Sequence, residues 1–200
     1  MDEDRPLRLA HPVEPSERRQ IVPNGVLGMM VFIITEAMFF AGLVSAFTLA
    51  KANALGGLWP PPGQVRLPAE ATAINTLALV ASGILIFAAG RKFDKSPASA
   101  IPMATVSILL GAIFVVLQGA EGVVLVSQGL TMTTSTHGAF FYLIVGSHAL
   151  HTVVGLGALA WMYRELRGGR LTSSAFWTVR IFWYFVVGLW PILYYKVYLA

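Results

Sequence analysis

Cysteine is absent from this 200-residue sequence, and charged residues are scarce. Without a thiol, the chain can form no disulfide, no iron–sulfur cluster, no thiolate zinc site and no copper site with bridging thiolates. Asp, Glu, Lys and Arg together make up only 12% of the residues, against roughly 25% in soluble proteins. So small a share of charge, in a chain this apolar, excludes an ordinary soluble enzyme and a disordered chain.

Apolar residues take the place of the missing charges. Hydrophobic residues account for 56% of the chain, and its mean hydropathy is +0.69. A soluble domain of this size cannot bury so much apolar surface, because its exterior still needs polar cover. The composition therefore indicates a polytopic helical membrane protein.

The apolar residues are gathered into five long runs, which predict an all-α bundle of five transmembrane helices. The predicted spans are 26–50, 72–90, 101–126, 138–163 and 179–199, forming one domain over residues 25–200. None of them alternates apolar and polar residues as the strands of a transmembrane barrel would. The uncharged part of the fifth span is the shortest, so we expect the flanking Arg180 and Lys196 to snorkel toward the membrane surfaces.

The basic residues predict how the bundle is oriented. Residues 1–24 form a polar arm, and we place it on the same side as the second and fourth loops. That side then holds Arg5, Arg8, Arg18, Arg19, Arg91, Lys92, Lys95, Arg164, Arg167, Arg170 and Arg180, whereas the other side holds Lys51, Arg66 and Lys196. Because basic residues gather in the cytoplasm, the N-terminus is predicted to be cytoplasmic and the C-terminus periplasmic. The net charge of +4 has the same origin, so no nucleic-acid partner is expected.

Ionisable side chains within the spans are functional candidates, because a charge there costs at least ~2.5–3.5 kcal/mol. Glu36 follows Gly25 by eleven residues, and His148 follows Gly138 by ten on a helix that runs the opposite way. At 1.5 Å per residue, each lies about 15–16 Å from its end of the membrane. His148 and His151, three residues apart, share a helix face. We therefore predict an intramembrane polar cluster of Glu36, His148 and His151, in which Glu36 meets the histidine face.

A second polar group is predicted near the outer surface. Glu121 is five residues from the end of the third span, and Asn75 is three residues into the second, which places both at a similar depth. Gln118 shares a helix face with Glu121 by the i, i+3 rule. We expect Glu121 to be hydrogen-bonded there, with Gln118 or Asn75 close by.

Several kinds of chemistry are open to the mid-membrane group. Imidazole and carboxyl groups can relay protons, and two imidazoles with a carboxylate can bind iron or zinc. A six-coordinate haem needs ligands on opposite sides of its iron, which two histidines on one face cannot provide, although one of them could hold a five-coordinate haem. The favoured interpretation is that these groups are hydrogen-bonded and specify helix packing. We accordingly predict no catalytic residue, metal or haem in this chain.

Small residues recur in the third and fourth spans and let helix backbones approach one another. The glycines concerned are Gly111, Gly119, Gly122, Gly138, Gly146, Gly155 and Gly157. They predict a tightly packed bundle. No inverted repeat of the transporter kind is visible in the sequence.

The polar motifs occur in an order that resembles one family. The chain reads GMMVFIITEAMFFAG over 28–42, Asn75-Thr76 followed by Ser82-Gly83, Gln118-x-x-Glu121, His137-Gly138-Ala139-Phe140-Phe141, GSHALH over 146–151, and Trp183-Tyr184-Phe185-Val186 with Trp190. Taken together over about residues 25–195, these segments resemble subunit III of haem–copper oxidases.

The sequence departs from that family at two points. Mitochondrial-type members have seven helices, of which this sequence lacks the first two, so it resembles the short five-helix bacterial form. The last helix of the family usually reads Trp-His-Phe-Val-Asp, where this chain has Tyr184 for the His and Val187 for the Asp. We expect a different neighbour at that face of the helix.

The resemblance implies an accessory subunit that carries no redox cofactor. Haem and copper are expected in partner subunits I and II, a phospholipid is expected to bind, and a larger respiratory supercomplex is a further expected assembly. Such a subunit supports the stability of the catalytic subunit and its proton uptake in the bacterial inner membrane. The altered last helix favours cytochrome c as the electron donor.

Three other functions stay open at this point. Two are related assemblies, namely subunit III of a quinol oxidase and a relative that accompanies a nitric oxide reductase. The third is of another class, a small independent proton-coupled transporter that uses Glu36, His148 and His151. Co-purification with haem-bearing chains separates the subunits from the transporter.

Overall fold

A computed structural model describes residues 23–54, 59 and 65–199 of the chain. Its long helices are α1 (Asn24–Ala52), α2 (Ala69–Phe93), α3 (Ile101–Ser127), α4 (Thr136–Arg167) and α5 (Ser173–Tyr194), with the short turns η2 (Pro97–Ala100) before α3 and η3 (Tyr195–Leu199) after α5. Five helices in these ranges are long and apolar enough to cross a membrane. The prediction of an all-α protein with five membrane-spanning helices is confirmed. Most of the polar arm predicted over residues 1–24 lies outside the described residues.

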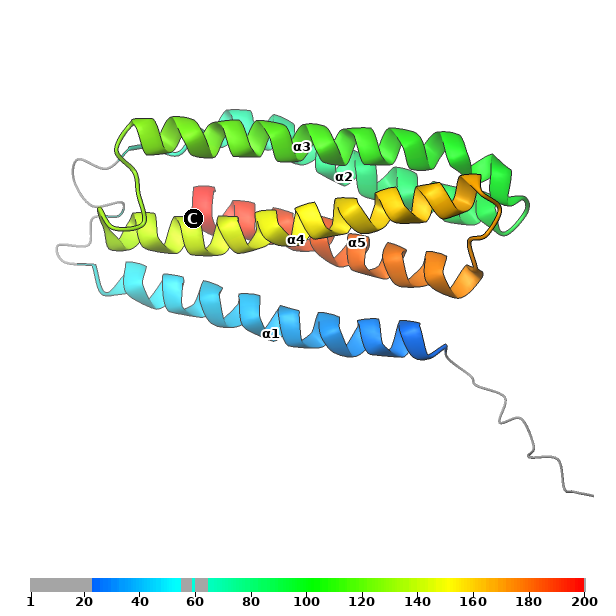
Figure 1. Cartoon of the computed structure of the whole chain (residues 1–200). Coiled ribbons are helices and arrows are strands. Elements are labelled where there is room, and N and C mark those ends of the chain that lie inside the picture. The colour runs from blue at the N-terminus through cyan, green and yellow to red at the C-terminus, as the bar shows by residue number, and fades with distance from the viewer. Residues whose placement is uncertain (1–22, 55–58, 60–64, 200) are drawn as a thin grey trace, which may run out of the picture.

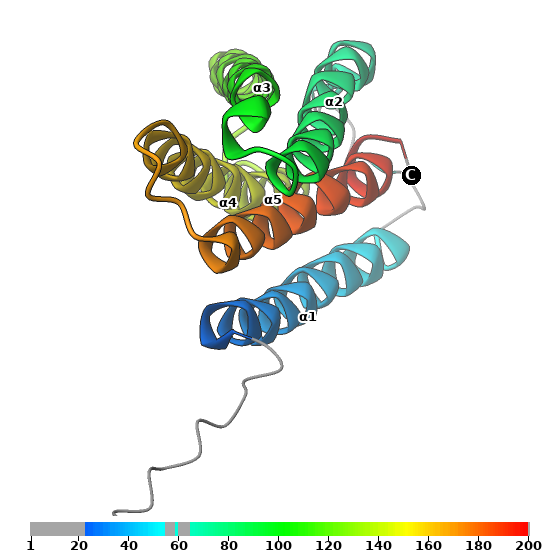
Figure 2. The same ribbon diagram turned by 90° about the vertical axis from the view of Figure 1, so that its right-hand side faces the viewer.

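The helices run alternately up and down in three layers (Figures 1 and 2). Helices α4 and α5 form the middle layer, with α1 packed on one side and α2 and α3 on the other. Only Phe40 and Phe47 of α1 are fully buried, so most of this helix faces away from the bundle. A helix exposed in this way suits a membrane, where its apolar side chains meet lipid or another chain.

Helices α2 and α3 form an antiparallel hairpin, joined by a short segment that includes η2. The buried Ser82 hydroxyl donates to the Ser107 carbonyl, and the Ser107 hydroxyl donates to the Ser82 carbonyl, both at 2.8 Å. Each serine thereby satisfies its polar group without water. The pair fixes the register of the two helices near the middle of the hairpin.

Trp183 of α5 is fully buried and contacts the three other helices α2, α3 and α4. Its indole nitrogen donates to Ser82 of α2 at 3.1 Å. Gly111 of α3 and Gly155 of α4 provide the space for its ring, since a Cβ added at either glycine would lie 2.9 Å from a ring carbon. These two glycines allow the close helix packing that the sequence predicted.

Other glycines do not have that role within the chain. A Cβ added at Gly119, Gly122, Gly146 or Gly157 would meet no atom within 4 Å. The expectation that every glycine of the third and fourth spans lets helices approach is therefore wrong for these four positions. Gly119, Gly122 and Gly146 line a cavity between α3 and α4, so the two helices stand apart at that level, and Gly157 is exposed on α4.

Basic residues separate by end of the bundle. The start of α1 and the ends of α2 and α4 lie together at one end (Figure 1). In the described ranges, that end carries Arg91, Lys92, Lys95, Arg164, Arg167, Arg170 and Arg180, and the opposite end carries Lys51, Arg66 and Lys196. We call these the cation-rich and cation-poor ends.

Candidate functional site

Glu36 of α1 and His151 of α4 form a polar contact inside the membrane-spanning region. The Glu36 Oε2 and His151 Nε2 atoms are 3.0 Å apart, and both side chains are largely buried. The ring of Phe40 packs edge-on to the His151 ring at 5.4 Å. The structure thus brings together two groups that the depth argument placed at the same level on antiparallel helices.

The other nitrogen of His151 fixes how protons are arranged in this pair. Nδ1 lies 2.7 Å from the carbonyl oxygen of Ser147, and a carbonyl can only accept, so Nδ1 carries a hydrogen. Nε2 then either accepts from a protonated Glu36 or, in a charged imidazolium, donates to its carboxylate. The pair holds one shared proton and no net charge in both arrangements. A pair of this kind avoids the cost of an isolated charge in the membrane.

His148 does not join this pair. It is 1% exposed, its ring stacks on Trp190 at 4.8 Å, and neither ring nitrogen has a hydrogen-bond partner. Three residues along a helix correspond to a rotation about 60° short of a full turn. The two histidine side chains therefore point in directions about 60° apart around the axis of α4. His151 points toward Glu36 of α1, whereas His148 points toward Trp190 of α5. The predicted three-residue cluster is therefore a bonded pair with a neighbouring histidine.

Glu121 of α3 is hydrogen-bonded at the cation-poor end. The Thr72 hydroxyl lies 2.8 and 2.9 Å from its two carboxylate oxygens, and the Tyr198 hydroxyl donates to it at 3.0 Å. Gln118 donates to the Tyr198 oxygen at 3.0 Å. Asn75 donates to Gln118 at 3.4 Å and to the Phe114 carbonyl at 3.2 Å. Glu121, Gln118 and Asn75 thus lie in one network.

Thr72 and Tyr198 were not identified from the sequence. Thr72 precedes Asn75 by three residues and so shares its helix face, a signal that was available. The sequence offered no such signal for Tyr198, which lies in η3 after α5. Its contact with Glu121 depends on the packing of α5 and η3 against α3. Pro191 stands inside α5 shortly before η3 begins, and its missing N–H interrupts the regular helix there.

Arg180 of α5 is buried and does not snorkel as expected. Its side chain is 5% exposed, its Nε donates to the Tyr184 hydroxyl at 3.0 Å, and its guanidinium carbon lies 4.8 Å from the Trp177 ring centre. Gly90 of α2 gives it room, since a Cβ there would overlap the guanidinium. Tyr184, which stands where the resembling family has His, thus accepts a hydrogen bond from Arg180.

Val187 also has a packing partner. A Cβ added at Gly83 of α2 would lie 2.8 Å from a methyl carbon of Val187. The apolar residue fills the space between the two helices where the family has an acid. Tyr184 and Val187 together face α2, which is the neighbour that this surface of α5 has in the structure.

The arrangement favours proton holding and helix packing over metal chemistry. In the ranges 23–54, 59 and 65–199, no three His, Cys, Asp or Glu side chains lie close enough together to hold a metal ion. Glu36 uses its carboxyl group on His151, and the network around Glu121 satisfies that carboxylate with hydroxyl groups. Both sites link helices that are distant in the sequence.

Comparison with known proteins gives consistent matches. Residues 16–200 match the family model described as cytochrome c oxidase subunit III. The chain is 34% identical over 187 residues to cytochrome c oxidase subunit 3 of Oryctolagus cuniculus, covering 89% of this chain and 70% of that protein. It is 35% identical over 180 residues to the protein of the same name from Gadus morhua, covering 86% and 67%.

Proposed function

The chain belongs to the cytochrome c oxidase subunit III family, and on that premise we propose that it is the accessory, cofactor-free third subunit of a bacterial haem–copper terminal oxidase. The observation that carries the proposal is the family match over residues 16–200, which spans all five membrane helices. The internal geometry supports it, because the intramembrane carboxyl groups are bonded to side chains of other helices. Polar contacts of this kind hold a bundle together.

The proposed partners are the oxidase subunits I and II, which would hold the haem and copper. Helix α1 offers a broad apolar surface for a neighbouring chain or lipid. Its exposed apolar side chains include Met30, Phe32, Ile34, Met38 and Phe39. Exposed apolar patches of this extent mark contact with a protein or a bilayer. Bound phospholipid is part of the proposal.

We further propose that the protein lies in a bacterial inner membrane with its cation-rich end in the cytoplasm. From that position the subunit would stabilise the catalytic subunit and support proton uptake from the cytoplasm. The Glu36–His151 pair is one group in this chain that can hold a proton within the membrane. Its contribution is proposed to be mainly structural.

Co-purification tests the assignment. The chain, tagged and extracted in mild detergent, is expected to bring down haem-bearing chains in stoichiometric amounts, seen in haem spectra and partner mass spectrometry. Oxygen consumption with cytochrome c or with quinol as the reductant identifies the donor, for which we expect cytochrome c. Recovery of the chain alone, with proton transport in liposomes, would favour the independent transporter and contradict the proposal.

The supporting role has its own test. An oxidase prepared without this chain should lose activity faster at a fixed temperature than the complete complex, while its haem spectrum stays the same at the start. Proton uptake on the cytoplasmic side should also be slower. Equal half-lives and uptake rates would show that the subunit does not stabilise or assist the catalytic chain.

A further inference from the structure

A cleft of about 490 Å³ lies between α2 and α3 at the cation-poor end of the bundle. Its walls are mostly apolar, with Ile74 from α2 and Leu117 and Val124 from α3. Glu121 and Asn75, two members of the hydrogen-bonded network described above, line the same space. An apolar cleft with a few placed polar groups is typical of a binding site. We call it the Glu121 cleft.

The hydrogen bonds of the network all run in one direction, toward the Glu121 carboxylate. The Asn75 amide donates to Gln118 at 3.4 Å, the Gln118 amide donates to the Tyr198 oxygen at 3.0 Å, and the Tyr198 hydroxyl donates to Glu121 at 3.0 Å. These groups and the Thr72 hydroxyl are uncharged. They bond the carboxylate but do not neutralise it.

Asn75 has an acceptor that the chain does not use. Its side chain is 4% exposed, and its Oδ1 atom has no hydrogen-bond partner. The amide orientation is fixed, because Nδ2 lies 3.2 Å from the Phe114 carbonyl oxygen, which can only accept. Buried polar atoms in native proteins are nearly always bonded. Asn75 Oδ1 and the Glu121 carboxylate, which line one cleft, therefore both indicate a ligand that donates hydrogen bonds.

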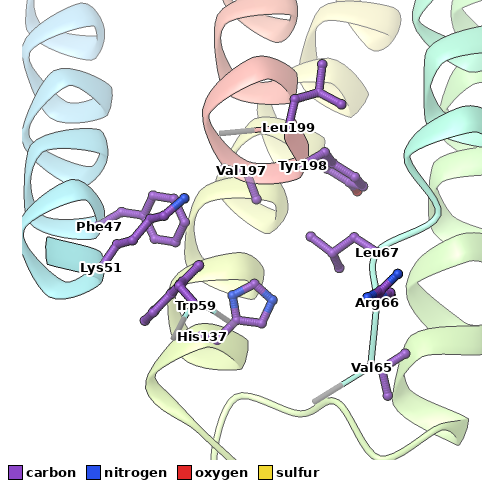
Figure 3. A pocket seen from close by; sticks show the side chains of 10 residues that line it. All are labelled: Phe47, Lys51, Trp59, Val65, Arg66, Leu67, His137, Val197, Tyr198 and Leu199. Atoms are coloured by element: carbon purple, nitrogen blue, oxygen red, sulfur yellow. The ribbon is translucent and has the colours of Figure 1, made fainter. Parts of the chain in front are cut away.

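The charge of Glu121 is not balanced by a cation of the described residues. Its carboxylate forms no ion pair with any Lys, Arg or His in 23–54, 59 and 65–199. Arg66 lines the Glu121 cleft but is exposed and makes no ion pair there. Figure 3 shows Arg66 and Tyr198 from a neighbouring cavity that both residues also line. An unpaired charge at this depth is costly, so a cation from outside the chain would stabilise it.

We propose that the Glu121 cleft receives a lysine side chain of a neighbouring membrane chain, whose ammonium group binds the Glu121 carboxylate and Asn75 Oδ1. An ammonium group has three donors and no acceptor, which matches two acceptors that lack donors. The methylene stem of a lysine packs along apolar walls such as those of Ile74 and Leu117. A bare metal ion fits less well, because Ca²⁺ takes six to eight oxygen ligands and would leave most of the cleft unfilled.

The surface around the cleft suits a transmembrane helix of a partner. Ile74 is 71% exposed, Leu117 50% and Val124 51%, so α2 and α3 present an apolar face on both sides of the cleft. A lysine near the end of a packed helix lies at the depth of Glu121, which is close to the end of α3. The inference rests on the proposed oxidase subunit and deepens it by naming where a partner subunit docks.

Zero-length cross-linking of the purified complex tests the contact. A carbodiimide activates a carboxyl group and joins it as an amide to an amine that touches it, and mass spectrometry identifies the linked peptides. Glu121 is expected to be linked to a lysine of a haem-bearing partner chain, and Glu121→Gln should remove that link. Glu165, which pairs with Arg170 near the other end of α4, is the control carboxyl group, and its products should be the same in both proteins.

Two variants that leave the network intact decide the question if Glu121→Gln does not assemble. Ile74→Trp fills the cleft and should lower the yield of the Glu121 link by about ten-fold, as expected when the contact is lost. Ile84→Trp enlarges a side chain that is 63% exposed on α2 but does not line the cleft, so the yield should not change. Arg66→Gln removes the cation that the chain itself has at the cleft and should also leave the link in place.

The outcomes separate this site from the oxidase assignment. The proposal is overturned if Glu121 is linked to Lys196 or another lysine of its own chain, to the amine of a lipid, or to nothing while Glu165 reacts. An equal yield from Ile74→Trp and Ile84→Trp also overturns it. Haem-bearing chains that co-purify without the link would contradict the site alone, whereas a link to a stoichiometric partner in a complex without haem would contradict the oxidase assignment alone.

Discussion

The two carboxyl groups within the membrane spans, those of Glu36 and Glu121, are each hydrogen-bonded to side chains of other helices. Glu36 and His151 share one proton between α1 and α4, with the Ser147 carbonyl fixing the tautomer. Glu121 is held by Thr72 and Tyr198. In both cases, the partner lies on another helix, so removing one side chain leaves a polar atom in a place without water.

Replacement of Glu36 tests the first pair. Glu36→Ala leaves the Nε2 atom of His151 without its partner, and the free energy of unfolding should fall by about 1–3 kcal/mol. Glu36→Gln should lose less, because its amide can donate to the same nitrogen. Thermal unfolding of the assembled complex measures both. The initial rate of oxygen reduction should be nearly unchanged, and an Ala variant that is fully stable but inactive would contradict the structural role.

The hydroxyl of Tyr198 tests the second network. Tyr198→Phe removes a donor to Glu121 and an acceptor for Gln118, so we expect a loss of about 1–3 kcal/mol in stability. Tyr194→Phe is the matched control, since its hydroxyl makes one bond, to the Ala69 carbonyl, and its loss should cost about 1 kcal/mol or less. Chemical denaturation in detergent compares the two. If the two variants lost the same stability, the Tyr198 hydroxyl in its network would contribute no more than a single hydrogen bond does.

At the scale of the helices, α5 is the element that joins the others. Trp183 donates to Ser82, and Trp190 donates to Thr76 at 2.8 Å, so both tryptophans bond to α2. Trp190 also stacks on His148 of α4. The Trp183 ring fits because Gly111 and Gly155 stand opposite it. Helix α1 has no comparable contact with α2 or α3 and is attached mainly through α4 and α5.

Alanine substitutions at two glycines of α4 distinguish the effect of side-chain packing on stability from the effect of backbone flexibility. Gly155→Ala places a methyl group 2.9 Å from the Trp183 ring, which should lower stability by about 1–3 kcal/mol through overpacking. Gly157→Ala adds the same group where nothing lies within 4 Å, so it should be neutral or stabilise the helix by up to about 1 kcal/mol. Thermal unfolding of the two variants gives the comparison. If both lose stability equally, the contact with Trp183 is not the cause.

The whole molecule has a cation-rich and a cation-poor end, which together define its proposed direction in the membrane. The cation-rich end contains the loops after α2 and α4. The cation-poor end contains the Glu121 network. If the cation-rich end is cytoplasmic, then the Glu121 network lies on the periplasmic side.

Cysteine labelling tests this direction, because the chain has no cysteine of its own. In intact cells, a membrane-impermeant thiol reagent should label a Lys196→Cys variant and should not label a Lys95→Cys variant. Permeabilised cells should show labelling at both positions, which controls for buried thiols. Labelling of the Lys95→Cys variant alone in intact cells would reverse the orientation.

The sequence alone predicted the helices, their number and the depth of their polar residues. These properties are local, because hydropathy marks each span and the helical rise converts residue number into depth. The level at which Glu36 meets His151 followed from that arithmetic. The family resemblance also followed from the order of motifs along the chain.

The tertiary structure decided which side chains meet at each depth. Rotation of a helix about its axis depends on what packs against it, and this rotation selected His151 over His148 for Glu36. It also buried Arg180 against Gly90, brought Tyr198 to Glu121, and divided the glycines into those that contact a neighbouring helix and those that do not. No local pattern contains this information, because each contact joins segments far apart in the sequence.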